Sequence, residues 1–183
     1  MMQKKVQIIS DGSLDLSQEL TKEKDIEVVP FYVSFDSETY QKEMVEVGVR
    51  EFYQEMVDHP TVFPKTSMPS VHDYYEVFEK YAKEQLPVIC ICITRKFSGS
   101  LQSATTAKDM ILEEYPDAQI TVIDSTVNTV LQGLYVLEAC RLRDMGLEYQ
   151  QIVDALLPIR ETGRIFFTIG SIDYLKHGGR IGK

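Results

Sequence analysis

The chain has 183 residues, of which 44% are hydrophobic and 26% are charged, and its formal net charge is −9. This length allows one ordinary domain, or one domain and part of a second. The composition is typical of a globular protein with a sizeable core. The negative charge argues against extended contact with nucleic acid or an anionic membrane, because both require clustered positive charge. Any anion that the protein binds must therefore be met by a local set of donors.

The beginning of the chain and its cysteines argue against several further classes of protein, namely secreted, membrane-spanning, disulfide-linked and metal-binding proteins. The segment MMQKKVQIISDGS shows no secretory signal, and no apolar run approaches the ~20 residues of a membrane-spanning helix. We therefore expect a cytoplasmic protein without membrane insertion. Cys90, Cys92 and Cys140 match no disulfide framework or metal-ligand spacing. Cys90 and Cys92 share one face of a predicted strand, which fits small core residues, with a soft metal as the alternative.

Strands and helices are predicted to alternate along the chain. Short apolar runs predict strands at residues 5–9, 27–35, 88–94, 120–123 and 164–170. Because proline cannot donate a backbone hydrogen bond, Pro30 places part of the second predicted strand at a sheet edge or in a bulge. Helical spacing predicts helices at residues 49–57, 70–85, 100–115, 128–145, 147–160 and 172–177. This alternation predicts an α/β fold, with a mostly parallel sheet and helices on both faces.

Small polar residues gather at the predicted strand ends, where parallel sheets bind their ligands. The clusters are Ser10-Asp11-Gly12-Ser13, Thr66-Ser67-Met68-Pro69-Ser70, Ser98-Gly99-Ser100 and Asp124-Ser125-Thr126. Ordinary helix caps explain Ser13, Ser70 and Ser125, and Asp73 completes an imperfect capping box with Ser70. In the third cluster, Gly99 lets the backbone approach a ligand, and the N–H groups of the next helix face that space. This turn is suited to a phosphate, sulfate or carboxylate.

Known catalytic and nucleotide-binding motifs do not account for this turn. The phosphate-loop and dinucleotide-binding glycine patterns are absent, and so is Gly-x-Ser-x-Gly. A bound, unreacted anion is therefore favoured over serine hydrolysis. Near the carboxyl end, Lys176, His177 and Gly178 are typical of a helix terminus. The second glycine lets Arg180 reach a neighbouring cleft, although a surface arginine is the equally simple interpretation.

Five segments, in order along the chain, resemble motifs of the DegV family of bacterial fatty-acid-binding proteins, which have the EDD fold. IISDGSLDL resembles the opening strand and its Asp-containing turn, and KTSMPS resembles the Thr-Ser-x-Pro-Ser motif. FSGSLQSA resembles the Ser-Gly-Thr-x-x-Ser-Ala loop, VIDS the next strand end, and YLKHGGRIG the Leu-Lys-x-Gly-Gly-Arg-Ile motif. The chain departs at Gly12, where many members have a hydroxyl residue, and at Ser100, where threonine is usual.

The resemblance implies a carrier rather than an enzyme, with no metal or cofactor. It implies one long-chain fatty acid, such as palmitate, in a tunnel between two α/β domains, and a partner fatty acid kinase that phosphorylates the bound acid. The carboxylate would be gripped by Thr66 and Ser98. The ligand-binding residues carried over are Thr66, Ser67, Ser98, Gly99, Ser100 and Arg180. Candidate tunnel residues, each of which is more readily explained as a core residue, are Phe97, Leu101, Val130, Leu134 and Phe166.

The resemblance also suggests where the domains divide. Residues 1–160 match the N-terminal α/β domain, and residues 161–183 match the beginning of a second, lipid-covering domain that continues in relatives and supplies a histidine to the carboxylate network. The chain is thus expected to be a fragment or a naturally shortened form. Two alternatives stay open. One is a phosphate-ligand α/β kinase or transferase that binds a metal through Asp11 or Asp124, and the other is a remnant that forms a homodimer to cover an exposed apolar face.

Overall fold

The computed structural model describes residues 5–166, 168, 170 and 172–179, and the chain packs as two compact units. Unit 1 comprises residues 1–29 and 69–165, and unit 2 comprises residues 30–68 and 166–183. The sequence did not indicate that residues 30–68 would separate from the first unit. The predicted domain boundary after residue 160 rests on the family resemblance alone, and it stays a prediction.

Unit 1 is built on a four-stranded parallel sheet with the order β2-β1-β6-β7. The strands are β1 (Gln7–Asp11), β2 (Ile26–Val29), β6 (Val88–Cys92) and β7 (Ile120–Asp124). In the middle of the sheet, Ile8 pairs with Ile26 on one side and with Ile89 on the other. Parallel neighbours require long crossover connections, which helices normally provide. The predicted α/β fold with a parallel sheet is confirmed.

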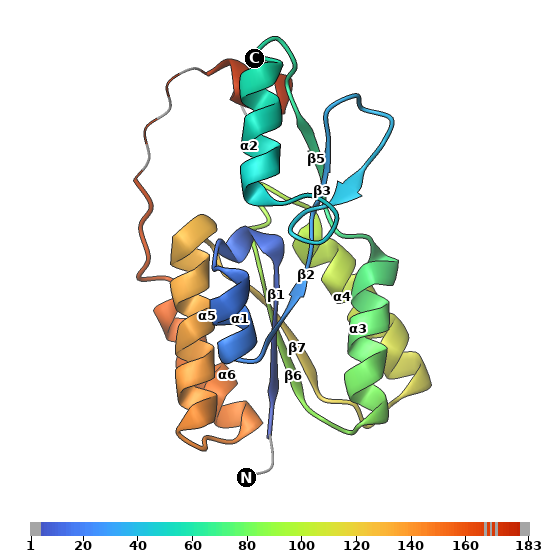
Figure 1. Cartoon of the computed structure of the whole chain (residues 1–183). Helices are drawn as coiled ribbons and strands as arrows, with labels where there is room; N and C mark the ends of the chain where they lie inside the picture. Colours follow the sequence, from blue (N-terminus) through green and yellow to red (C-terminus); the bar gives the residue numbers. More distant parts are fainter. Residues whose placement is uncertain (1–4, 167, 169, 171, 180–183) are drawn as a thin grey trace. The chain divides into compact units, whose positions relative to one another are not determined.

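Helices cover both faces of this sheet (Figure 1). One face carries α1 (Gln18–Glu23), α5 (Thr129–Asp144) and α6 (Tyr149–Ile159), and the other carries α3 (Val71–Lys83) and α4 (Ser100–Glu114). A short 3-10 turn, η1 (Gly12–Leu14), follows β1. No helix in the described part of the chain is both long and apolar enough to cross a membrane.

Alternation along the strands divides the core of unit 1 between these two faces. In β6, Ile89 and Ile91 belong to the cluster on the α5 and α6 side, whereas Cys90 and Cys92 belong to the cluster on the α3 and α4 side. The two sulfur atoms lie 3.7 Å apart, and both residues are buried free cysteines. The interpretation of Cys90 and Cys92 as small core residues is thus confirmed.

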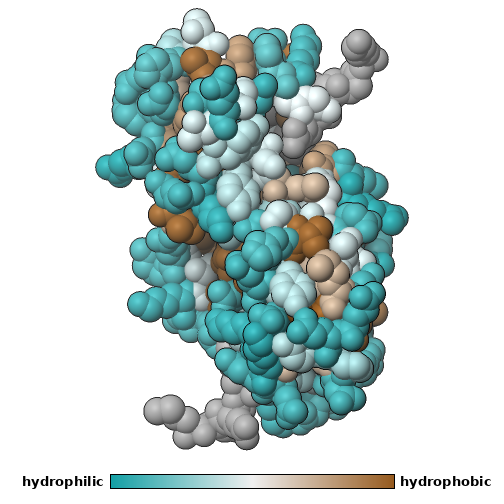
Figure 2. Space-filling view, turned by 90° about the vertical axis from the view of Figure 1, so that its right-hand side faces the viewer, coloured by the Kyte–Doolittle hydropathy of each residue, from teal (hydrophilic) through white to brown (hydrophobic). Residues whose placement is uncertain are grey.

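Helix α3 begins with the predicted capping box. The Ser70 Oγ accepts a hydrogen bond from the Asp73 N–H at 3.1 Å, and an Asp73 carboxylate oxygen accepts one from the Ser70 N–H at 2.8 Å. The inner side of the helix buries Tyr74 and Phe78. Mainly hydrophilic side chains cover the outer side of this helix layer (Figure 2). This polarity difference directs the helix onto the sheet.

Unit 2 contains a three-stranded antiparallel sheet with the order β4-β3-β5. Its elements are β3 (Tyr32–Ser34), β4 (Gln41–Lys42), α2 (Val49–Asp58), β5 (Lys65–Ser67) and α7 (Asp173–His177). The single strand predicted at residues 27–35 is two strands, because Pro30 lies between β2 and β3. The strand predicted at 164–170 is wrong for the residues described there, since 164–166, 168 and 170 lie outside any strand. A strand needs a hydrogen-bonded neighbour, which an apolar run alone does not provide.

Candidate functional site

The candidate site lies at the carboxyl edge of the parallel sheet in unit 1. Ligands of open α/β sheets bind at this edge, where strands lead into helix amino termini. Here β6 leads through Thr94 into the Ser98-Gly99-Ser100 turn, and α4 begins at Ser100. The 15-residue helix therefore directs its first N–H groups toward the space above this edge.

The Ser98 hydroxyl group can donate a hydrogen bond to a ligand at this turn. The Ser100 N–H donates to the Ser98 Oγ at 3.2 Å. Because the Ser98 oxygen already accepts this hydrogen bond, the hydroxyl hydrogen points away from the Ser100 amide. It has no acceptor among the residues that the structure describes. Ser98 is half-buried and Gly99 is exposed, so a ligand can reach both residues.

The turn is electropositive although the chain is acidic overall. A helix amino terminus carries roughly half a positive charge, and no acidic residue lies in the first turn of α4. The exposed residues Arg95 and Lys96 precede the turn and are separated from it only by Phe97. Arg95 forms a 3.6 Å ion pair with Asp124, but its side chain is 79% exposed, so this pair holds the arginine only weakly. These features favour an anionic group beside Ser98.

A buried polar cluster centred on Asp11 supports the turn from inside unit 1. Asp11 is the last residue of β1 and is fully buried. Its Oδ2 accepts hydrogen bonds from the Ser100 hydroxyl at 2.7 Å and from the Ile93 N–H at 2.9 Å. Its Oδ1 accepts one from the Gln132 amide at 2.8 Å, and the Ser13 N–H is a fourth donor. One carboxylate thus connects β1, β6, α4 and α5.

Tyr74 extends the cluster into α3. Its hydroxyl oxygen lies 2.6 Å from the Ser100 Oγ and 3.7 Å from the Cys92 sulfur. Ser100 gives its only hydroxyl hydrogen to Asp11, so it accepts from Tyr74. The Ser100 side chain is buried and engaged on both sides, which gives it an internal role. Its predicted direct contact with a ligand stays a prediction.

Gln132 extends the cluster on the opposite face of the sheet. Its Nε2 donates to the Ser10 Oγ at 3.1 Å, in addition to Asp11, and the Ser10 hydroxyl donates to the Ile91 carbonyl at 2.8 Å. Gln132 is fully buried on α5. The cluster therefore spans the helix layers on both sides of the sheet.

The charge state of Asp11 follows from its partners. Burial raises the pKa of Asp11, and the hydrogen bonds from Ser100, Ile93, Gln132 and Ser13 oppose that rise. An ionised carboxylate only accepts hydrogen bonds, and backbone N–H groups only donate them. Burial also holds the pKa of Tyr74 well above its ordinary value, so Tyr74 remains a neutral donor. The arrangement fits an ionised Asp11 surrounded by donors.

An apolar hollow of about 140 Å³ lies at the neighbouring exit of β7. Its lining includes Val127, Leu131, Leu134, Tyr135, Ile159 and Gly163. The Thr94 N–H donates to the Val127 carbonyl at 3.0 Å and so joins the exit of β6 to that of β7. Gly163 keeps one wall open, because a Cβ atom there would lie 3.1 Å from a Leu131 methyl carbon. A polar turn and an apolar hollow thus occupy adjoining strand exits.

The predicted site residues fall into three groups. Ser98, Gly99 and Ser100 form the turn in unit 1. Thr66 and Ser67 are exposed residues of β5 in unit 2, so their predicted contact with the Ser98 turn stays a prediction. Arg180 lies outside the described residues. Of the tunnel candidates in unit 1, Leu134 lines the hollow and Val130, on the same helix, is exposed.

Sequence reasoning missed the supporting roles of Tyr74 and Gln132. Tyr74 was one of several aromatic residues on an apolar helix face. Gln132 carried a usable signal, because it lies three and four residues before the buried Tyr135 and Val136 of α5. A polar residue on such a stripe must find buried partners.

The carboxylates that suggested a metal-dependent enzyme have other partners. Donors surround Asp11, while Asp124 pairs with Arg95 and accepts from the Thr126 N–H at 2.9 Å. Among the described residues, no group of three or more His, Cys, Asp or Glu side chains is placed to hold a metal ion. The arrangement of Asp11 and Asp124 therefore gives the kinase or transferase alternative no specific support.

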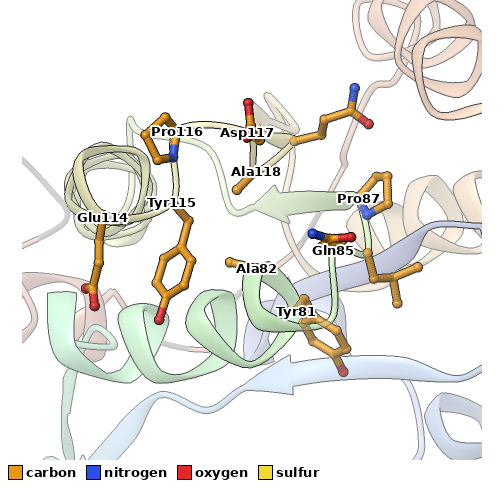
Figure 3. Close-up of a pocket in the computed structure, with 11 residues that line it drawn as sticks. Tyr81, Ala82, Gln85, Pro87, Glu114, Tyr115, Pro116, Asp117 and Ala118 are labelled. Carbon is orange, nitrogen blue, oxygen red and sulfur yellow. The ribbon is translucent and has the colours of Figure 1, made fainter.

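A larger hollow, of about 480 Å³, opens at the opposite edge of the unit 1 sheet (Figure 3). It lies where α3 and α4 end, and its lining includes Tyr81, Tyr115, Glu114 and Asp117. Helix carboxyl termini carry partial negative charge. Together with the two acidic side chains, they make this hollow unfavourable for an anion.

Comparisons with known proteins agree with these features. A family model described as "Uncharacterised protein, DegV family" matches residues 5–183. A DegV domain-containing protein of Clostridium perfringens is 31% identical over 177 residues, which are 97% of this chain and 62% of that protein. A second one, from Halalkalibacterium halodurans, is 34% identical over 97% of this chain and 61% of its own length.

Two solved structures share the fold over nearly the whole chain. One is described as a fat acid (stearic acid)-binding protein from Eubacterium ventriosum; it is 49% identical, with a TM-score of 0.92, over 97% of this chain and 61% of that one. The other is a DegV family protein from Thermus thermophilus described by its fatty acid binding; it is 30% identical, with a TM-score of 0.81 and the same coverages. The chain thus spans about three fifths of the length of these relatives. It belongs to the DegV family.

Proposed function

We propose that this chain binds a long-chain fatty acid, with the carboxylate at the Ser98-Gly99 turn and the acyl tail leaving along the apolar exit of β7. The observation that carries the proposal is the Ser98 hydroxyl before α4, which has no acceptor among the described residues, together with an apolar hollow at the adjoining strand exit. A ligand that matches both parts has an acceptor-only, anionic head and an apolar tail. The relative described as binding stearic acid, which is 49% identical, supports this ligand class.

The head group has two sources of stabilisation in unit 1. A hydrogen bond from Ser98 to a charged carboxylate contributes about 1.5–3 kcal/mol. The amino terminus of α4 contributes about 0.3–1 kcal/mol more. Thr66, Ser67 and Arg180 are the further donors that the family resemblance implies. Together these groups orient the acid and distinguish its head from a neutral one.

The tail supplies most of the affinity. Burial of an acyl chain contributes about 0.8 kcal/mol per methylene, so more than a dozen methylenes outweigh the head-group contacts. The hollow of about 140 Å³ is smaller than the roughly 300–1,000 Å³ of typical small-molecule sites. It accommodates only part of a long tail. The remainder of the tail needs apolar surface beyond this hollow, as the tunnel expected from the family resemblance would provide.

In this role the chain is a carrier and not an enzyme. The family resemblance further implies that a partner kinase phosphorylates the carboxylate of the bound acid. A carboxylate held at the rim of a sheet, with its tail buried, would leave the reacting oxygen reachable by such a partner. The binding partners proposed for this chain are therefore a fatty acid and a fatty acid kinase.

The first test is extraction of lipid from the purified chain followed by mass spectrometry. We expect one acyl chain per protein molecule, or its uptake after incubation with stearate. A reproducible lack of acyl chains in both samples would overturn the proposal. Co-purified phospholipid in place of free fatty acid would overturn the carboxylate assignment.

The second test removes the proposed head-group donor. In Ser98→Ala, we expect stearate to bind about tenfold or more weakly, because one hydrogen bond to a charged group is lost. Octadecanol, which has the same tail and a neutral head, should lose much less affinity. Thr106→Ala removes a hydroxyl group farther along α4 and should leave both affinities unchanged. Equal losses for both ligands would show that Ser98 does not recognise the carboxylate.

A further inference from the structure

We propose that Asp11 is the positioning residue of this site: it fixes the Ser98 hydroxyl as a donor and thereby makes the turn select an ionised carboxylate over a neutral head of equal length. The selectivity rests on the proposed fatty acid function. The positioning itself can be measured without any ligand.

The first of the two connecting hydrogen bonds joins Asp11 to Ser100. The Asp11 Oδ2 accepts from both the Ser100 hydroxyl at 2.7 Å and the Ile93 N–H at 2.9 Å. Ser100 is the first residue of α4, and Ile93 directly follows β6. One oxygen atom therefore holds both the strand exit and the helix start, which are the two ends of the connecting loop. With its hydrogen committed to Asp11, the Ser100 hydroxyl accepts from Tyr74 and cannot rotate freely.

The second step runs from Ser100 to Ser98. With Ser100 held, its backbone N–H points at the Ser98 Oγ, 3.2 Å away. The Ser98 oxygen is then an acceptor inside the turn, and its hydrogen is left for the ligand. An ionised carboxylate only accepts hydrogen bonds, so it fits this polarity, whereas an alcohol head must also place a hydrogen of its own. Asp11 thus influences the ligand through two intervening hydrogen bonds and without contacting it.

The orientation of the Gln132 amide matches an Asp11 carboxylate that accepts hydrogen bonds. The Gln132 Oε1 is buried without a hydrogen-bond partner in the described part of the chain, which is an unfavourable state for a polar atom. The opposite amide orientation would direct this oxygen at the Asp11 carboxylate. Gln132 instead turns its Nε2 toward Asp11 and leaves the oxygen unpaired. The cluster is therefore organised to supply donors to Asp11.

The decisive experiment compares stearate with octadecanol in the full chain. In Asp11→Ala, we expect the preference for stearate to fall about tenfold, while octadecanol affinity stays nearly constant. In Asp11→Asn, the side-chain oxygen still accepts from Ser100 and Ile93, and its NH₂ group can donate to Gln132 once that amide turns. The preference should then be largely retained. A proportional loss for both ligands in Asp11→Ala would overturn the inference, because a purely structural residue would have that effect.

The matched control is Ile152→Ala. Ile152 is fully buried on α6 and belongs to the core of the same unit, but it has no hydrogen bond to the cluster. It should lower stability and leave the head-group preference intact. If Asp11→Ala does not fold, Ser100→Ala tests the same connection with a smaller perturbation. An unchanged preference in Ser100→Ala would also overturn the inference.

Amide hydrogen exchange of the ligand-free chain separates this inference from the proposed function. In Asp11→Ala, exchange at Ile93 and Ser100 should accelerate about tenfold or more beyond that in Ile152→Ala, whereas Asp11→Asn should stay near the wild type. Unchanged protection in Asp11→Ala would refute the positioning role, whatever the ligand result. Faster exchange in a chain that binds neither probe would instead refute the fatty acid function, and the selectivity with it.

Discussion

The two edges of the unit 1 sheet differ in charge more than in the space that they offer. The amino edge has the larger hollow, which Figure 3 shows and whose volume is about 480 Å³. The hollow at the carboxyl edge has a volume of only about 140 Å³. At the amino edge, helices end and Glu114 and Asp117 line the opening. At the carboxyl edge, α4 begins, Ser98 offers a hydroxyl hydrogen, and the carboxylate of Asp11 is buried among donors.

The comparison shows that polarity rather than volume identifies the site for an anionic head. Helix dipoles make one edge positive and the other negative in any sheet whose strands run parallel. At the carboxyl edge, donors surround Asp11 and Arg95 pairs with Asp124, and Lys96 adds a further positive charge. At the amino edge, Glu114 and Asp117 line the opening. The space for the tail is a separate requirement, which the apolar exit of β7 meets in part.

The largest expected effect tests whether the stability of the carboxyl edge depends on Asp11. Asp11→Ala leaves four buried donors without their acceptor, and we expect the free energy of unfolding to fall by about 3 kcal/mol or more. Asp117→Ala, at the exposed amino edge, should change it by no more than about 0.5 kcal/mol. Urea denaturation of both variants measures the difference. Similar losses in the two variants would remove the contrast between the edges.

A smaller effect is expected where α5 packs against the turn that follows Asp11. A Cβ atom on Gly133 would lie 2.4 Å from the Leu14 carbonyl oxygen and 2.8 Å from a Leu16 methyl carbon. Gly133→Ala should therefore destabilise the fold by about 1–3 kcal/mol, despite a gain in helix propensity of about 1 kcal/mol. Thermal unfolding of the variant and the wild type measures this change in the free energy of unfolding.

Gly48→Ala is the control for this substitution, because no heavy atom lies within 4 Å of the added Cβ position. It should lower the free energy of unfolding by less than about 1 kcal/mol, because the only loss is that alanine is a poorer N-cap of α2 than glycine. A neutral Gly133→Ala would mean that α5 can move away from the η1 turn without cost, and that the turn does not hold Asp11 against Gln132.

The smallest expected effect is a pH dependence of stability. Burial raises the pKa of Asp11 in the folded chain above its ordinary value of about 3.9. Its contribution to stability is therefore fully present below that ordinary value and is lost as pH rises through the folded value. The difference in unfolding free energy, wild type minus Asp11→Asn, should fall between acidic and neutral pH.

The titratable groups that face Asp11 should not obscure this trend. Burial raises the pKa of Tyr74, and the hydrogen bond between Cys92 and Cys90, together with burial, raises the pKa of Cys92. These groups stay neutral over the range, and Gln132 on α5 carries no charge. Asp117→Asn reports the background pH dependence of the fold. If the difference in unfolding free energy between the wild type and Asp11→Asn grew with pH, it would contradict the raised pKa of Asp11.

Local signals predicted most of unit 1. The apolar run at residues 88–94 became β6, and Ser70 with Asp73 formed the capping box that starts α3. Each of these signals lies within a few residues, so the sequence contains it directly. The same holds for the Ser98-Gly99-Ser100 turn, whose glycine and hydroxyl groups lie at a strand exit. The strand predicted at 164–170 failed because strand formation also depends on a partner elsewhere in the chain.

The supporting cluster could not be predicted in the same way. Asp11 and Ser100 are 89 residues apart in sequence, and Asp11 and Gln132 are 121 residues apart. The residues that flank Asp11, Ser100 or Gln132 in the sequence contain no signal that identifies the other two as partners. Asp11 was therefore considered as a metal ligand, and Ser100 as a direct ligand contact. Only the assembled sheet shows that the two residues bond to each other.

The sequence by itself determined the alternation of strands and helices, the anion-suited turn and the resemblance to the DegV family, because periodicity, capping and motifs are written in neighbouring residues. The tertiary structure decided which side chains of the turn face inward and which face outward. That choice depends on buried hydrogen bonds between distant segments, since a buried donor must find an acceptor wherever the fold provides one. Ser100 turns inward to Asp11 for this reason, and Ser98 is left as the outward donor.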